Sequence, residues 1–386
     1  MHGPSTHPWV EGETLGTHLE ERGVDRREFL TFCGKMVAIL GLANSALPRM
    51  AEALQSIKRP SVIWIQLQEC TGCVESLLRS AEPTVGDLVL DVISLDYQHT
   101  LMAAAGSDLE RALQSSMAEN KGKYVLVVTG SIPTKENGIY CTIGGRPAQE
   151  ILEEAAAGAA AILAVGACAY WGSVQAARPN PTGAVGVRDI IKNKPVLNIP
   201  GCPPIGDVIT ATIAHYLTFN RLPEADGEGR PLFAYGKRIH DQCTRRSHFD
   251  AGQFVEVFDD EAARKGWCLY HVGCKGPATF SPCPIFLWNT RTSWPIGAGH
   301  PCIGCTEPYF WDTMTPFYDR LPGVVGFGVE RRADIIGATL AGAVTAGIAL
   351  HATATGIYQL RHRRQAEDAE GAATAAAATK EDSSNG

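Results

Sequence analysis

Two kinds of segment alternate along the chain between Arg59 and about Leu222. Apolar runs rich in β-branched residues are predicted to be strands, and they are Ser61–Leu67, Leu88–Leu95, Tyr124–Thr129, Ala161–Val165 and Val196–Ile199. The stretches predicted to be helices are Cys73–Ser80, Leu101–Ala118, Pro147–Ala157 and Pro204–Thr218. Strands that are apolar throughout are typical of a parallel sheet covered by helices on both faces. We therefore expect residues 59–222 to form one α/β domain with a flavodoxin-like, doubly wound parallel sheet.

The pattern changes after Leu222, where a polar connector (Pro223–Pro231) opens a second region, residues 223–330. Glycine and proline are frequent between Cys268 and Cys305, so a long helix or strand does not fit there. Such a segment buries too little apolar surface to fix its own fold. We expect an irregular domain that metal clusters or disulfides cross-link.

The C-terminal part contains a long uncharged run. Residues Ile335–Leu360 include no Asp, Glu, Lys or Arg, and a run of this length can cross a bilayer. Pairs of small residues four positions apart, Ala338/Gly342 and Ala343/Gly347, suit packing on another membrane helix. We predict one transmembrane helix over residues 335–360, with a soluble amphipathic helix as the alternative. The basic residues that follow favour a cytoplasmic C-terminus, and the tail (361–386) is expected to be disordered.

Residues 1–53 are predicted to be a twin-arginine signal peptide. The arginine pair Arg26-Arg27 is followed by the modestly apolar run Met36–Leu42, with small-residue cleavage candidates near Ser45-Ala46 or Ala51-Glu52-Ala53. An ordinary amphipathic helix with two arginines is the alternative. Because this route exports folded proteins, a cofactor inserted in the cytoplasm crosses with the chain. We therefore expect the bulk of the chain in the periplasm, anchored to the cell membrane by its C-terminal helix.

Composition narrows the range of functions. A formal net charge of −7 and a pI near 5.9 argue against a nucleic-acid-binding face. The Gly144-Gly145 pair makes no dinucleotide fingerprint, and no P-loop or catalytic triad motif is present. The chain has twelve cysteines, and removal of the leader takes Cys33 with it. The eleven that remain are an odd number, which favours metal ligation over a pure disulfide framework.

Four cysteines follow predicted strands directly: Cys70 and Cys73 after the first, Cys168 after Ala161–Val165, and Cys202 after Val196–Ile199. Ligands of an open parallel sheet bind outside the carboxyl ends of its strands. These strand ends therefore deliver four thiolates to one crevice, which is what a cubane iron–sulfur cluster needs. The alternative is that each is a buried structural cysteine.

The second region holds further candidate ligands. His240 and Cys243 are three residues apart, so both can reach one metal site. Between residues 268 and 305 only Cys302–Cys305 has the CxxC spacing that structural zinc favours, so iron–sulfur ligation suits the irregular spacing better. Zinc and, in an exported chain, disulfides remain alternatives. Cys141 has no evident partner and is expected to be a buried free thiol.

Six ordered motifs carry a family resemblance. They are E-C-T-G-C-x-E-S from Glu69, G-x-C-A-x-W-G from Gly166, N-x-P-G-C-P-P from Asn198, I-H-D-x-C-x-R-R-x-H-F-D-A-G from Ile239, C-L-Y-x-x-G-C-K-G-P from Cys268 and W-P-I-x-x-G-H-P-C-I-G-C from Trp294. Together they resemble the small subunit of a membrane-bound nickel–iron uptake hydrogenase. The resemblance extends from the leader to the C-terminal tail, and it implies three iron–sulfur clusters in a row.

The resemblance also implies the cluster ligands. A proximal 4Fe–4S cluster would be held by Cys70, Cys73, Cys168 and Cys202. A medial 3Fe–4S cluster would be held by Cys283, Cys302 and Cys305, with Pro295 where a fourth cysteine would complete a cubane. A distal 4Fe–4S cluster would be held by His240, Cys243, Cys268 and Cys274. Oxygen-tolerant relatives have two extra cysteines where this chain has Gly72 and Ser173.

The implied role is electron transfer in a hydrogenase heterodimer. Hydrogen would be split at the nickel–iron site of a large subunit, so no catalytic residue is expected in this chain. Electrons would leave for a membrane cytochrome b, another membrane subunit or the quinone pool, with a surface-exposed His240 suited to the exit. His351 lies within the predicted membrane span, where it would face a partner helix, contribute to a haem environment in a membrane cytochrome, or simply be a polar residue near the interface. The rival interpretations are an electron-transfer subunit of a complex-I-like dehydrogenase and a disulfide-stapled binding module without redox activity.

Overall fold

The computed structural model of the chain describes residues 14–21, 24–56, 60–81, 84, 93–321 and 329–382. Two compact units are present, Met1–Leu321 and Pro322–Gly386. The first contains the sheet and every cysteine of the chain. The second contains one long helix.

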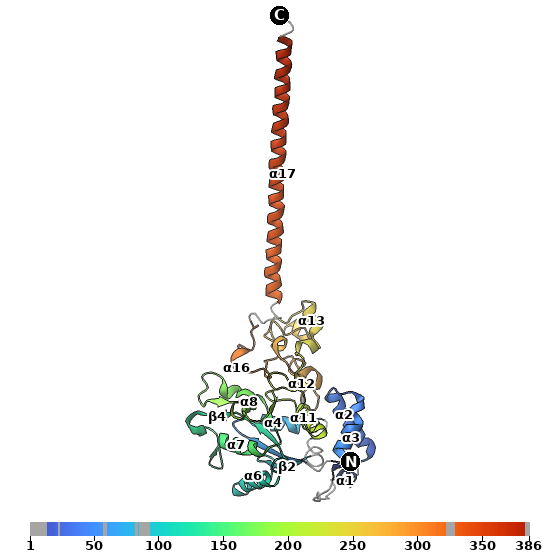
Figure 1. Cartoon of the computed structure of the whole chain (residues 1–386), viewed down its shortest axis with the longest axis vertical. Helices are drawn as coiled ribbons and strands as arrows, with labels where there is room; N and C mark the ends of the chain where they lie inside the picture. Colours follow the sequence, from blue (N-terminus) through green and yellow to red (C-terminus); the bar gives the residue numbers. More distant parts are fainter. Residues whose placement is uncertain are drawn as a thin grey trace. The chain divides into compact units, whose positions relative to one another are not determined.

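A five-stranded parallel sheet forms the centre of the first unit (Figure 1). Its strands are β1 (Ser61–Gln66), β2 (Ser94–Gln98), β3 (Val125–Thr129), β7 (Ala161–Val165) and β9 (Val196–Ile199). Their order in the sheet is β2-β1-β3-β7-β9, which is the order of a flavodoxin-like fold. The predicted doubly wound parallel sheet is therefore confirmed. The order reverses between β1 and β3, and ligands of such sheets bind at that switch point.

The strands bury side chains on both faces, because they are apolar throughout. Val62 and Trp64 of β1 join one core with α4 (Gly72–Leu78) and α11 (Gly206–Phe219). Ile63 and Ile65 join the opposite core with α6 (Ser107–Glu119) and α7 (Ala148–Gly158). The alternation of neighbouring residues between the two cores follows from the period of a strand.

Two elements of the sheet domain differ from the prediction by more than two residues at a boundary. The helix expected from Leu101 begins at Ser107, because residues 99–106 form turns and bends before Gly106, which has φ 58°. The strand expected at Leu88–Leu95 is observed at Ser94–Gln98. Residues 88–92 of that prediction lie outside the described residues.

Short elements complete this domain. They are β4 (Ile132–Pro133), η3 (Lys135–Gly138), β5 (Thr142–Ile143), β6 (Arg146–Pro147), α8 (Ala167–Trp171), α9 (Ser173–Ala176), β8 (Ala184–Val185) and α10 (Val187–Ile190). Gly144 and Gly145 make the turn between β5 and β6, and both have positive φ. The glycine pair therefore closes a two-residue hairpin.

The N-terminal residues form helices that pack on the domain: α1 (Leu15–Glu21), α2 (Arg26–Ile39), η1 (Asn44–Ala46) and α3 (Leu47–Ser56). Asp25 and Glu28 form a capping box at the start of α2. Cys33 and Met36 of α2 and Met50 of α3 are buried in the same core as α11. Figure 1 shows α2 and α3 beside α11. Arg26 and Arg27 remain exposed.

Within the predicted region 223–330, residues 223–321 form an irregular arrangement of very short helices and turns, and residues 322–328 lie outside the described residues. The helices are α12 (Leu232–Tyr235), η4 (His240–Gln242), α13 (Arg246–Asp250), α14 (Glu261–Arg264), η5 (Gly276–Ala278), α15 (Cys283–Phe286) and α16 (Phe310–Thr313). Buried Arg230 ties this region together through ion pairs to Asp226 (2.8 Å) and Glu307 (3.1 Å).

The second unit is the helix α17 (Val329–Asp382). Its segment Gly337–Ala373 has a mean hydropathy of 1.4 in its most apolar window, so length and composition allow it to cross a membrane. The disorder expected after residue 360 is not observed up to Asp382, where the chain stays helical. The alanines of residues 372–378 have the highest helix propensity, which explains the difference.

Candidate iron–sulfur sites

The loop after β1 presents Cys70 and Cys73. Backbone hydrogen bonds to the neighbouring loop hold it, from Leu67 N to Thr129 O (2.9 Å) and between Gln68 and Ser131 in both directions. Thr71 then adopts a left-handed conformation with φ 68°, and α4 starts directly after it. The turn places both cysteines at the carboxyl end of β1, next to the switch point of the sheet.

Cys168 and Cys202 reach the same place from β7 and β9. The two loops are joined by hydrogen bonds from Gly166 N to Ile199 O (2.9 Å) and from Ala167 N to Gly201 O (2.7 Å). Gly166 has φ 93°, and a Cβ at this position would overlap Cys73 Sγ. Glycine is therefore required here both for the backbone conformation and for the close approach of two loops.

These four cysteines, which we call the proximal group, affect one another's charge. Burial raises the pKa of Cys73 well above its ordinary value, and the charges of Glu69, Cys168, Cys202 and Cys70 raise it further. Burial and Cys202 raise the pKa of Cys168 to about 12. Adjacent thiolates repel one another in a poorly solvated site, so a bound metal has to supply the compensating positive charge. This donor set fits a four-iron cluster.

Two polar side chains, Gln175 and Ser173, lie beside the proximal group. Cys168 Sγ donates to Gln175 Oε1 over 3.5 Å, and Gln175 Nε2 donates to Gln68 O over 3.0 Å. Burial raises the pKa values of Cys168 and Cys202, and the buried Ser173 hydroxyl, which faces both thiols, offsets part of this rise. A Cβ at Gly72 would lie 3.3 Å from Cys70 Sγ. Residues 72 and 173 thus lie beside the proximal group. Sequence analysis did not identify Gln175, because it lies outside the six motifs.

Cys70 and Cys202 are exposed on this chain, whereas Cys73 and Cys168 are buried. The proximal group therefore opens to one surface of the first unit.

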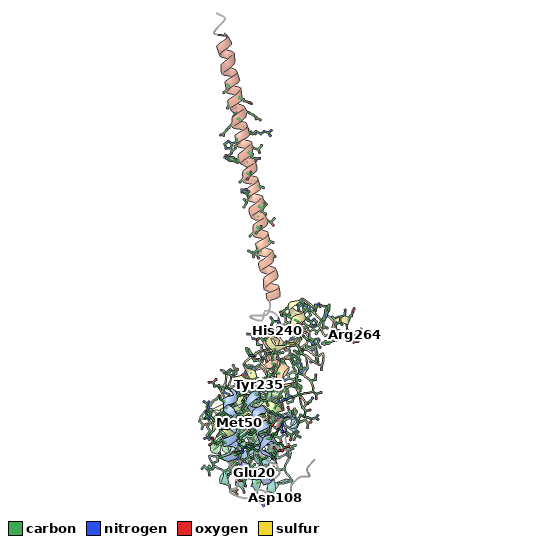
Figure 2. All side chains as sticks on the ribbon, turned by 90° about the vertical axis from the view of Figure 1, so that its right-hand side faces the viewer. Glu20, Met50, Asp108, Tyr235, His240 and Arg264 are labelled. Atoms are coloured by element: carbon green, nitrogen blue, oxygen red, sulfur yellow. The ribbon has the colours of Figure 1, made fainter. Side chains whose placement is uncertain are left out.

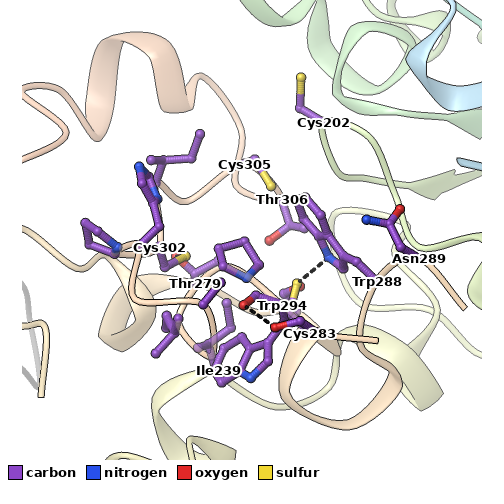
Figure 3. A pocket seen from close by; sticks show the side chains of 18 of the residues that line it. Cys202, Ile239, Thr279, Cys283, Trp288, Asn289, Trp294, Cys302, Cys305 and Thr306 are labelled. Carbon is purple, nitrogen blue, oxygen red and sulfur yellow. Dashed lines mark hydrogen bonds between the residues drawn. The ribbon is translucent and has the colours of Figure 1, made fainter. Parts of the chain in front are cut away.

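A second set, the medial group, consists of Cys283, Cys302 and Cys305. The three cysteines and Pro295 line one cavity of about 470 Å³, and Cys202 of the proximal group lies at its edge (Figure 3). Hydrogen bonds reach the sulfur of Cys283 from Trp288 Nε1 (3.4 Å) and that of Cys302 from Gly304 N (3.3 Å), and Ser281 Oγ lies 3.1 Å from Cys283 Sγ. Three thiolates around a roomy cavity fit a three-iron cluster.

The distal group consists of His240, Cys243, Cys268 and Cys274. Burial raises the pKa of Cys268 to about 12, with further contributions from Cys274 and Cys243, which places the three thiols together. The backbone of Ile239 pairs with Thr279, and a Cβ at Gly276 would lie near both Ile239 and Cys274 Sγ. The segment that carries His240 therefore runs beside the segment that carries Cys274.

The expected surface exposure of His240 is wrong for this chain. Only 5% of the residue is exposed, and its ring packs edge-on against Phe249 at 4.6 Å between centroids. Figure 2 shows His240 and Tyr235 within the first unit, whereas Arg264 projects from it. Burial and Arg246 lower the pKa of His240 to about 4, so its imidazole is neutral at pH 7 and able to bind a metal.

The three groups follow one another in space. Cys202 of the proximal group lies close enough to Cys305 of the medial group to raise its pKa, and Cys274 of the distal group does the same to Cys302. In each case burial is the larger cause. The groups therefore form a series: proximal, medial, distal.

All twelve cysteines are free thiols, so the disulfide-stapled alternative is wrong. Cys141 is free as predicted, but only partly buried. Within the described ranges, no three His, Cys, Asp or Glu side chains converge on a point where a single ion could bind. In an iron–sulfur cluster each thiolate binds a different iron, so its ligands are spread more widely than those of one ion.

Two family models match the chain. The model for the C-terminal part of the NiFe/NiFeSe hydrogenase small subunit matches residues 235–318, which contain the medial and distal groups. The model for the 20 Kd subunit of NADH ubiquinone oxidoreductase matches residues 70–216. The first domain is thus common to both classes of enzyme, and the cysteine-rich region distinguishes them.

Relatives of similar length extend the comparison over most of the chain. The uptake hydrogenase small subunit of Azotobacter vinelandii is 52% identical over 351 residues, covering 91% of this chain and 98% of the relative. The hydrogenase-1 small chain of Escherichia coli K12 is 48% identical over 353 residues, covering 92% and 95%. The NiFeSe hydrogenase structure from Desulfomicrobium baculatum superposes with a TM-score of 0.65 at 35% identity, covering 68% of this chain and all of that one. The chain therefore belongs to the small subunits of nickel–iron uptake hydrogenases and, as a small subunit, is the electron-transfer partner of a large subunit.

Proposed function

We propose that this chain relays electrons from H2 oxidation in the large subunit to a membrane acceptor, a cytochrome b or the quinone pool. The proximal group would hold a 4Fe–4S cluster, the medial group a 3Fe–4S cluster and the distal group a 4Fe–4S cluster. Bound iron–sulfur clusters supply one-electron carriers. The chain itself binds and orients the clusters and excludes water from the space between them.

The observation that carries this proposal is the unbroken series of cysteine groups. The proximal group opens to the surface through Cys70 and Cys202, where the large subunit can cover it. Cys202 also lies at the edge of the medial cavity, and Cys302 lies beside Cys274 of the distal group. Electrons that enter at the proximal group would therefore pass from one cluster site to the next through the first unit.

The donor sets differ in charge. A neutral imidazole at His240 replaces one thiolate in the distal group, which lowers the net negative charge of its cluster and tends to raise the reduction potential. The medial group has only three thiolates, with Pro295 in its wall. The chain can thus hold the three clusters at different reduction potentials, because its three ligand sets differ in the number of thiolates.

The proximal cluster is proposed to be a standard four-cysteine cubane with one-electron behaviour. The positions of the two extra cysteines of oxygen-tolerant relatives are filled by Gly72 and Ser173, and both lie next to proximal cysteines. Neither can add a thiolate. An EPR experiment that finds two successive one-electron oxidations of the proximal cluster would contradict this proposal.

The main test uses the complex of the full chain with its large subunit, purified from membranes. Iron and acid-labile sulfide analysis, with EPR at controlled potentials, should detect two four-iron clusters and one three-iron cluster. Cys274→Ser should remove the distal signal alone. Cys141→Ser, at a thiol outside all three groups, is the matched control and should retain every signal. A colourless, iron-free complex would overturn the proposal.

We also propose that the twin-arginine leader carries the folded chain to the periplasm and that α17 anchors it in the membrane. The exposed pair Arg26-Arg27 at the start of α2 is accessible to an export receptor. Replacing both arginines with lysine should leave the chain in the cytoplasm, as fractionation with immunoblotting would show. The same replacement at Arg49, which lies outside the motif, should not affect export. Normal export of the double variant would contradict the proposed route.

A further inference from the structure

The loop from Leu287 to Arg291 has an unusual backbone. Four of its five residues have left-handed φ values: Leu287 (57°), Asn289 (50°), Thr290 (54°) and Arg291 (61°). None of them is glycine, and side chains with a Cβ seldom adopt this conformation. Such a segment persists only where its surroundings hold it in place, and such segments are concentrated at functional sites.

Contacts with the first domain hold this loop. Arg291 Nε donates to Asp207 Oδ2 over 2.9 Å. Asp207 is 3% exposed, and its Oδ1 accepts from Ala81 N (2.8 Å) and Ser80 Oγ (3.1 Å). Thr290 N donates to Arg79 O over 3.1 Å. The loop, which belongs to the cysteine-rich region, is therefore fastened to the ends of α4 and α11.

The loop carries Trp288, whose indole points at the medial group. Its Nε1–H donates to Cys283 Sγ over 3.4 Å, drawn as a dashed line in Figure 3. Hydrogen bonds from Trp288 N to Ser293 O (2.6 Å) and from Thr292 N to Trp288 O (2.9 Å) fix the backbone on both sides. The ring lines the same cavity as the three medial cysteines, and Cys283, whose sulfur accepts the bond, is buried.

We propose that Trp288 raises the reduction potential of the medial cluster through its hydrogen bond to Cys283, and that the Arg291–Asp207 ion pair is the positioning device that holds it there. This inference rests on the proposed function, because it assumes that Cys283 is a cluster ligand. A cluster becomes more negative on reduction, so a donor to its thiolate stabilises the reduced form more than the oxidised form. The effect is strongest where water is excluded.

The tryptophan donor differs from the backbone donor of the medial group. Gly304 N donates to Cys302 Sγ and cannot be removed by a side-chain substitution. The indole N–H of Trp288 can be removed while the ring is kept in place as phenylalanine. It therefore offers a direct measurement of what one hydrogen bond contributes to the potential.

The test compares variants of the purified membrane complex. Trp288→Phe should shift the potential of the three-iron EPR signal to a more negative value and leave both four-iron clusters unchanged. Trp294→Phe is the matched control, because Trp294 lines the same cavity without donating to any cysteine that the structure describes. Its medial potential should equal that of the unmodified complex.

The positioning role has its own readout. Arg291→Gln and Asp207→Asn should shift the medial potential in the same direction as Trp288→Phe, by a smaller amount, and Arg291→Lys should restore part of the shift. Combining Arg291→Gln with Trp288→Phe should add nothing to the Trp288→Phe shift, because both changes act through one hydrogen bond. Additive shifts would remove the positioning role.

Failure of the inference can be distinguished from failure of the proposed function. A three-iron signal that keeps its potential in Trp288→Phe would overturn the inference and leave the electron relay intact. A complex that never shows a three-iron signal would overturn the medial assignment itself.

Discussion

At the scale of single residues, the geometry of the three cysteine groups depends on positions that have no ligand chemistry of their own. Gly166 lets two loops meet at Cys73, and Gln175 connects Cys168 to the loop of Gln68. The cysteines supply the donors, while these neighbours determine where the donors lie. Substitutions at the neighbours should therefore alter cluster content without removing a thiolate.

Gly166→Ala should prevent assembly of the proximal cluster. A methyl group there would overlap Cys73 Sγ, and alanine at φ 93° adds a backbone cost of about 1–2 kcal/mol. Iron analysis and the proximal EPR signal measure the loss. Gly122→Ala separates the two effects, since Gly122 also has positive φ (79°) but no atom within 4 Å of the added methyl. If both variants retained the proximal signal, the close approach at Gly166 would have no role in assembly.

Pro295→Cys should convert the medial cluster from three irons to four. Pro295 lines the cavity that holds the three medial cysteines, so a thiol there would supply the missing ligand. The added thiolate increases the negative charge and should lower the medial potential, with loss of the three-iron EPR signal. Pro295→Ala removes the ring without adding a donor and should keep that signal. An unchanged medial signal in Pro295→Cys would argue against the assignment.

At the scale of elements, buried polar contacts hold the irregular region together and join it to the sheet domain. Arg230 is 5% exposed and pairs with Asp226 and Glu307, and its guanidinium lies 5.4 Å from the centre of the Phe280 ring. The fully buried Tyr235 donates from its hydroxyl to Pro200 O over 2.7 Å. Because short helices with few apolar contacts cannot fix their own positions, such contacts determine how the medial group faces the sheet.

Arg230→Met should destabilise the first unit by about 3 kcal/mol, because it leaves the partly buried carboxylates of Asp226 and Glu307 without a cation. The free energy of unfolding, from denaturant titration of the complex, provides the measurement. Arg111→Met breaks the solvent-exposed pair with Asp108 and should cause no measurable change. Equal effects of the two substitutions would show that burial of the Arg230 pairs does not matter.

At the scale of the whole molecule, the chain combines a cofactor-binding unit with a helix that can span a membrane. α17 has a segment, Gly337–Ala373, that is long and apolar enough to cross a membrane. A helix of this kind is stable in a bilayer, where every backbone group is satisfied internally. Membrane attachment should therefore depend on α17 and not on the cofactor-binding unit.

Deleting residues 322–386 should release the complex from membranes into the soluble fraction. The measurement is hydrogenase activity and immunoblotting of both fractions after cell disruption. A deletion of residues 374–386 alone keeps the apolar segment and should leave the complex in the membrane. Retention of the longer deletion in the membrane fraction would show that another subunit supplies the anchor.

Local patterns in the sequence were sufficient to predict the sheet, the placement of the proximal cysteines and the long C-terminal helix. Apolar runs predicted the parallel sheet, because fully buried strands need apolar residues on both faces. Cysteines at the ends of three strands predicted the proximal group, since the carboxyl ends of parallel strands meet at one edge. The uncharged run after Asp334 predicted a long apolar helix, which is observed, and six motifs identified the family.

Only the tertiary structure decided how distant residues meet. The pairing of Trp288 with Cys283, the fastening of Arg291 to Asp207 and the burial of His240 against Phe249 left no periodic signal in the sequence. The packing of the N-terminal helices on α11 was likewise not predicted. The periodicity of apolar residues and the propensity for helix or strand depend on neighbours along the chain. These contacts join segments that are far apart in the sequence, so they form only when the whole unit packs. The sequence therefore specified the kind of cofactor, and the fold specified the order of the groups and the hydrogen bonds that act on them.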